Sequence, residues 1–121
     1  MERKYYNEKP DPFETIRSVG AFITIVRFNI SESEDEEQGA WQCDEVTYGH
    51  KSPINEGDYG ALVSTLVRSR FSADEVEAIL NNYLGGLEAG VEDFDRLQQW
   101  RAEAKQKAKD ILGYGAEQGG V

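Results

Sequence analysis

Residues 20–30 carry the clearest pattern in the chain, a run of β-branched and aromatic residues without a helical period. Phe22 and Val26 fall on one face of an extended strand, whereas Arg27 and Asn29 make the other face polar toward its end. Such residues fit a pleated surface that is buried on one side. We therefore predict a strand here, with one face in the core.

A second strand is predicted over residues 41–48, after a polar break. Its alternation of apolar and polar positions slips between Cys43 and Val46. Either a bulge near residues 44–45 or partial burial of both faces would account for the slip. The two strands together predict an antiparallel β-hairpin over residues 19–49.

Three helices are predicted over residues 55–112. Apolar residues recur at helical spacing in the first of them: Tyr59, Leu62, Val63, Leu66 and Val67. Asn55 is a suitable N-cap for this helix, and Ser72 and Glu75 form a capping box at the start of the second. Gly113 ends the third.

The remaining segments lie at the two ends of the chain. Pro10 and Pro12 favour extended or turn geometry, so residues 1–18 are interpreted as an irregular arm. Residues 114–121 are predicted to be a disordered tail. The fold class is therefore α+β: an N-terminal arm and an antiparallel hairpin followed by three helices, in a single domain over residues 1–113.

Charge narrows the choice of partners. The formal net charge is −10, and much of it lies in the loop of residues 32–37 and in the second helix. Such a field repels phosphate backbones, so we expect no nucleic-acid partner. The loop acids are consecutive and Gly39 follows them, which does not match a calcium-binding loop. A solvated hairpin tip is the better interpretation, and no metal or other cofactor is expected.

Cys43 and His50 are the single cysteine and the single histidine. If both belong to one strand, their odd separation places the side chains on opposite faces, too far apart for a nucleophilic pair, unless a bulge changes the alternation. A buried cysteine and a loop histidine are the alternative that we prefer. We therefore expect no enzyme, although a carboxylate site formed by paired acids remains a second alternative.

Positive charge gathers late in the third helix, where Arg101, Lys105 and Lys109 recur every four residues. They could form a ridge that faces an anion. Acids earlier in the same helix and basic residues near its end also suit the helix dipole, and this is the interpretation that we prefer. Arg68 and Arg70 after the first helix are interpreted in the same way.

Four aromatic residues are candidates for partner binding: Trp41, Trp100, Tyr5 and Tyr6. The tryptophans are expected in the core, and either one would become a partner anchor if it proved exposed. A two-stranded hairpin is only marginally stable alone. It must therefore pack on the helices or gain strands from another copy, which makes a homo-oligomer the expected state.

The run from Leu66 to Ile79, the triplet Asn81-Asn82-Tyr83 and the run from Gln98 to Lys105 resemble a known group of sequences. They are similar to the C-terminal half of small uncharacterised phage or prophage accessory proteins of Bacteroides-type bacteria. Those accessory proteins are tail-associated or resemble tail-fibre assembly proteins. The resemblance covers residues 59–112 and implies no catalytic residues.

These patterns favour a non-enzymatic structural or protein-interaction component, and the resemblance implies a prophage-encoded tail accessory or assembly protein. The alternative is an acidic decoy or regulator that binds a basic protein surface. Residues 19–30 are too short and too polar for a signal sequence or a membrane span, so a cytoplasmic protein without a membrane partner is expected.

Overall fold

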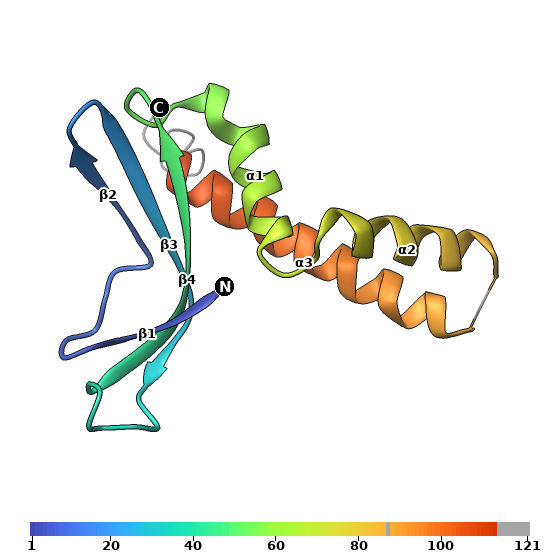
Figure 1. Cartoon of the computed structure of the whole chain (residues 1–121), viewed down its shortest axis with the longest axis horizontal. Coiled ribbons are helices and arrows are strands. Elements are labelled where there is room, and N and C mark those ends of the chain that lie inside the picture. Colours follow the sequence, from blue (N-terminus) through green and yellow to red (C-terminus); the bar gives the residue numbers. More distant parts are fainter. Residues whose placement is uncertain (87, 114–121) are drawn as a thin grey trace. The chain divides into compact units, whose positions relative to one another are not determined.

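The computed structural model describes residues 1–86 and 88–113. The fold is α+β, with a four-stranded antiparallel sheet followed by three helices (Figure 1). The chain divides into two compact units, Met1–Ile54 and Asn55–Val121. The single domain over residues 1–113 stays a prediction, and the tail predicted at residues 114–121 lies outside the described residues.

The first unit is a sheet with the strand order β1-β4-β3-β2, in which all neighbours are antiparallel. Its strands are β1 (Glu2–Tyr6), β2 (Phe13–Ser18), β3 (Ala21–Glu32) and β4 (Trp41–His50). The hairpin predicted from the sequence is confirmed as the central pair β3 and β4. Its two outer edges are covered by strands from the N-terminal residues of the same chain.

The prediction of an irregular arm over residues 1–18 is therefore wrong. Tyr6 pairs with Trp41 at the end of β1, and Phe13 pairs with Val26 at the start of β2. The hairpin edges offer unpaired backbone groups, and the arm satisfies them. The prolines lie in the connection between β1 and β2, where no ladder hydrogen bond is required.

The irregularity of the hairpin lies on the other strand from the one predicted. The bulge expected at residues 44–45 is found in β3 after Phe28, where the register shifts. Asn29 there has a φ of 54°, a left-handed conformation that Asn tolerates better than most residues. β4 instead follows the alternative prediction, because Cys43 on one face and Val46 on the other are both buried.

The second unit consists of three α-helices, the first preceded by a short 3₁₀ turn at Glu56–Asp58. The helices are α1 (Tyr59–Arg68), α2 (Ala73–Leu84) and α3 (Glu88–Leu112). Both capping boxes are present, with Asn55 at the 3₁₀ turn and Ser72 at α2. α1 and α2 each pack on α3, which is longer than either of them (Figure 1).

Two contacts fix α2 against the start of α3. The rings of Tyr83 and Phe94 stack with their centroids 3.9 Å apart. Gly90 lies against the backbone of Asn82, so closely that a Cβ atom added there would lie 2.8 Å from the carbonyl carbon. The close approach needs a residue without a side chain at position 90, and it gives the two helices a defined register.

No helix within residues 1–86 and 88–113 is both long enough and apolar enough to cross a membrane.

Candidate functional site

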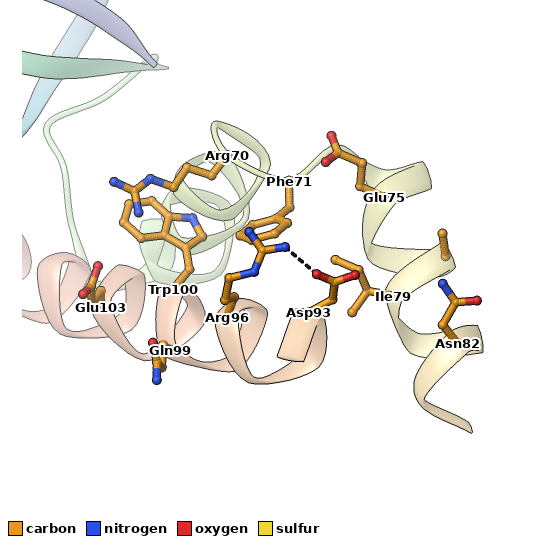
Figure 2. Close-up of a pocket in the computed structure, with 11 residues that line it drawn as sticks. Arg70, Phe71, Glu75, Ile79, Asn82, Asp93, Arg96, Gln99, Trp100 and Glu103 are labelled. Carbon is orange, nitrogen blue, oxygen red and sulfur yellow. Dashed lines mark hydrogen bonds and ion pairs between the residues drawn. The ribbon is translucent and has the colours of Figure 1, made fainter. Parts of the chain in front are cut away.

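A groove between α2 and α3 has a volume of about 560 Å³ (Figure 2). Its floor is formed by Phe71, which follows α1, Ile79 from α2 and Trp100 from α3. Ile79 and Trp100 are buried, whereas Phe71 is partly exposed. The groove therefore offers an aromatic and aliphatic surface to an apolar group.

Trp100 is held rigidly at this floor. Its indole Nε1 donates a hydrogen bond of 3.0 Å to the carbonyl oxygen of Leu66 in α1, and the side chain is 3% exposed. The guanidinium of Arg70 lies over the ring, 4.1 Å from its centroid, as Figure 2 shows. Such a cation–π contact holds the Arg70 charge at the mouth of the groove.

Charges of both signs line the rim. Arg96 forms an ion pair with Asp93 one turn earlier in α3, and both side chains point into the groove in Figure 2. Glu75 accepts a hydrogen bond from the backbone N–H of Ser72, so one of its oxygens serves the helix cap. A groove of this kind can bind a segment that carries an apolar side chain between polar groups of both signs.

The four aromatic residues predicted to bind a partner are not brought together at this groove. Tyr5, Tyr6 and Trp41 are partly buried residues of the sheet, and only Trp100 belongs to the helical unit. Trp100 is in the core, as expected. Trp41 is partly exposed, and the Nζ atom of Lys9 lies 5.5 Å from the centroid of its ring.

Arg27 forms a buried charged cluster that joins all four strands of the sheet. Its side chain is 3% exposed, and its Nε donates to a carboxylate oxygen of Glu45 on β4 at 2.9 Å. One terminal nitrogen donates to Glu14 of β2 and to the hydroxyl of Tyr6 of β1. The other donates to the carbonyl of Asp11 in the connection between those strands.

The protonation states of this cluster suit a structural role. Burial would lower the pKa of Arg27, but its hydrogen bonds to Glu45 and Glu14 outweigh burial and raise that pKa. Burial, together with a hydrogen bond to Glu45, also raises the pKa of Tyr6. Arg27 therefore stays charged and Tyr6 stays protonated at neutral pH, which keeps the N-terminal strands bonded to the hairpin.

Cys43 and His50 do not form a nucleophilic pair. They lie on opposite faces of β4, as their odd separation predicts. Burial raises the pKa of the Cys43 thiol, which is 1% exposed. The Nδ1 of His50 donates to the carbonyl of Ser52 at 2.7 Å, and its Nε2 is hydrogen-bonded to the Thr24 hydroxyl at 2.8 Å.

The acidic loop offers no organised metal site. Ser33 and Asp35 hydrogen-bond to each other within a local turn. No group of three or more His, Cys, Asp or Glu side chains in the described part of the chain could hold a metal ion.

Sequence reasoning missed the α2–α3 groove and the Arg27 cluster. Arg70 and Trp100 are thirty positions apart, and no periodicity indicates that they stack. Arg27 did carry a signal, because a charge inside an apolar strand usually needs a buried partner. No protein-family model, curated protein or solved structure matches the chain.

Proposed function

We propose that this chain is a non-enzymatic protein-interaction component that binds a segment of a partner protein in the α2–α3 groove. The observation that carries the proposal is the apolar floor of this groove, where Phe71 is partly exposed next to the buried Trp100, bordered by charges of both signs. Binding energy at protein interfaces concentrates on buried aromatic and arginine side chains with a polar rim. Trp100, Phe71 and Arg70 supply that combination here.

The partner segment that fits is a peptide with one apolar side chain flanked by an acidic and a basic residue. The apolar side chain would lie on Phe71 and Ile79. The acidic residue would pair with Arg70, and the basic residue with Glu103, which also lines the groove. A small neutral ligand would leave these charges without partners, so it fits the groove less well.

The proposed setting is the cytoplasm, where the chain would act as a homo-oligomer. The resemblance of residues 59–112 to phage accessory proteins motivates the further proposal that the partner is a component of phage tail assembly. The α2–α3 groove supports the proposal of a protein-interaction component, and the resemblance supports the proposal of a phage setting.

Site-specific photo-crosslinking tests the groove directly. A photoreactive phenylalanine analogue is placed at Gln99, which lines the groove, or at Ala102, which is exposed on α3 and does not line it. We expect one protein from a lysate of the native host to crosslink at position 99 and not at position 102. Arg70→Glu should abolish that crosslink. Equal labelling at both positions, or labelling that survives Arg70→Glu, would refute the groove as the binding site.

A further inference from the structure

A second groove, among all three helices, has a volume of about 450 Å³ and shares no lining residue with the groove of Figure 2. Its apolar surface comes from valines of α1 and α2, and its charges come from the end of α1 and the middle of α3. The residues that matter are Val63, Val67, Val76, Arg68, Arg101 and Lys105. No acidic residue lines it.

The three cations of this basic groove are available to a ligand. Arg68 and Lys105 are exposed and Arg101 is partly exposed. Within residues 1–86 and 88–113, none of the three forms an ion pair or a side-chain hydrogen bond. Arg101 and Lys105 are one turn apart on α3, with Cβ atoms about 6 Å apart at that spacing. In a chain of net charge −10, this is a local concentration of unpaired positive charge.

The complementary surface is present on the same chain. The acidic tip, residues 32–37, carries five acids and no base. Glu34, Glu36 and Glu37 are exposed, and none of them pairs with a base in the described part of the chain. Trp41 lines a hollow of about 530 Å³ together with Glu36, so an aromatic ring accompanies the carboxylates.

We propose that the basic groove binds the acidic tip of a second copy of this chain. The carboxylates of the tip pair with Arg68, Arg101 and Lys105, and the glutamate methylenes and the Trp41 ring lie on the valines. Each copy has one tip and one groove, so the contact joins two different surfaces. The proposal rests on the self-association part of the proposed function and not on the α2–α3 groove.

The net charge of the chain determines how salt should act on this contact. Two copies of charge −10 repel each other at long range, whereas the tip and the groove attract at short range. At about 0.15 M salt the Debye length is about 8 Å, so the long-range repulsion is largely screened while the contact pairs remain effective. At about 1 M salt the contact pairs are screened as well. Association should therefore be strongest at intermediate salt.

Sedimentation equilibrium of the full chain measures this association. Lys105→Glu and Lys109→Glu alter the net charge equally and lie one turn apart on α3, yet only Lys105 lines the basic groove. We expect Lys105→Glu to weaken self-association by about tenfold, because an attractive pair becomes a repulsive one. Lys109→Glu should leave it within about twofold of the unmodified chain.

A mixing experiment tests the identity of the occupant. Glu36→Lys alone should weaken self-association as Lys105→Glu does. An equimolar mixture of the two variants should associate again, because the intact tip of one meets the intact groove of the other. A chain that is monomeric at every concentration, equal effects of Lys105→Glu and Lys109→Glu, or a mixture that stays monomeric would each overturn the proposal. Crosslinking at Gln99 is read out separately and can succeed or fail on its own.

Discussion

Replacement of Arg27 by methionine should strongly destabilise the sheet. Methionine keeps most of the volume of the side chain and removes the charge that pairs with Glu45 and Glu14. Arg27 is 3% and Glu45 7% exposed at the side chain, so the Glu45 carboxylate would stay buried without its counter-ion. Breaking a buried pair in this way costs about 3–5 kcal/mol.

Loss of the other partners of Arg27 lowers the free energy of unfolding by less. The Glu14 side chain is 45% exposed and is solvated when the arginine is absent, so loss of that pair costs about 0–1 kcal/mol. The carbonyl of Asp11 loses one donor. Arg27→Met should therefore lower the free energy of unfolding by about 4 kcal/mol, a large share of the 5–15 kcal/mol typical of a domain.

Urea unfolding followed by Trp41 fluorescence measures this loss. All variants carry Trp100→Phe, so that the signal reports the sheet alone. The matched control is Arg3→Met, which removes an arginine on β1 that is 46% exposed and pairs with Asp44. The control should cost much less than Arg27→Met, because an exposed ion pair is solvated and screened.

A double variant shows whether buried charge is the cause. Arg27→Met combined with Glu45→Leu leaves neither charge in the sheet, and it should recover much of the lost stability. The reasoning is refuted if Arg27→Met costs no more than Arg3→Met, or if the double variant costs the sum of the two single changes.

Two further predictions concern the helical unit and the Cys43 thiol. Gly90→Ala should destabilise the packing of α2 on α3 by about 1–3 kcal/mol, because the added Cβ atom has no room. In the control, Gly60→Ala in α1, the added Cβ atom meets nothing within 4 Å, so this change should raise the free energy of unfolding by about 0.5–1 kcal/mol. Urea unfolding followed by circular dichroism compares the two variants. The raised pKa of the buried Cys43 thiol means that the unfolded chain releases this proton first as the pH rises above about 8.5. The free energy of unfolding should then fall at alkaline pH, and this decline should be smaller in Cys43→Ala. Identical pH profiles of the two chains would contradict the prediction.

Local signals allowed most of the elements to be predicted. Ser72 and Glu75 cap α2 through hydrogen bonds within one turn, so their spacing alone identifies the helix start. β3 follows from its β-branched and aromatic residues, since these favour a strand wherever it pairs.

Distant pairing could not be predicted in the same way. Residues 2–6 contain charged and aromatic residues without a distinct strand pattern, and they become β1 because the edge of β4 is available to them. The bulge after Phe28 likewise depends on register with a partner strand. Strand propensity depends on such context more than helix propensity does.

The two grooves could not be predicted from the sequence, for a related reason. The sequence alone indicates that Arg68 is a partner of the helix dipole, and that Arg101 and Lys105 belong to a dipole-matched helix. Those interpretations consider each helix alone. The packing of α1 and α2 on α3 brings the three cations to one groove, which changes what they can bind.

The geometry of α3 makes the two grooves separable by experiment. Successive residues of an α-helix point about 100° apart. Trp100 and Arg101 are consecutive, and accordingly Trp100 lines the α2–α3 groove and Arg101 the basic groove. A change at Arg101 can therefore remove self-association while the aromatic floor stays intact, and Arg70→Glu can alter partner binding while the cations at the basic groove remain. If self-association and partner binding are lost independently, α3 contributes residues to two separate binding sites.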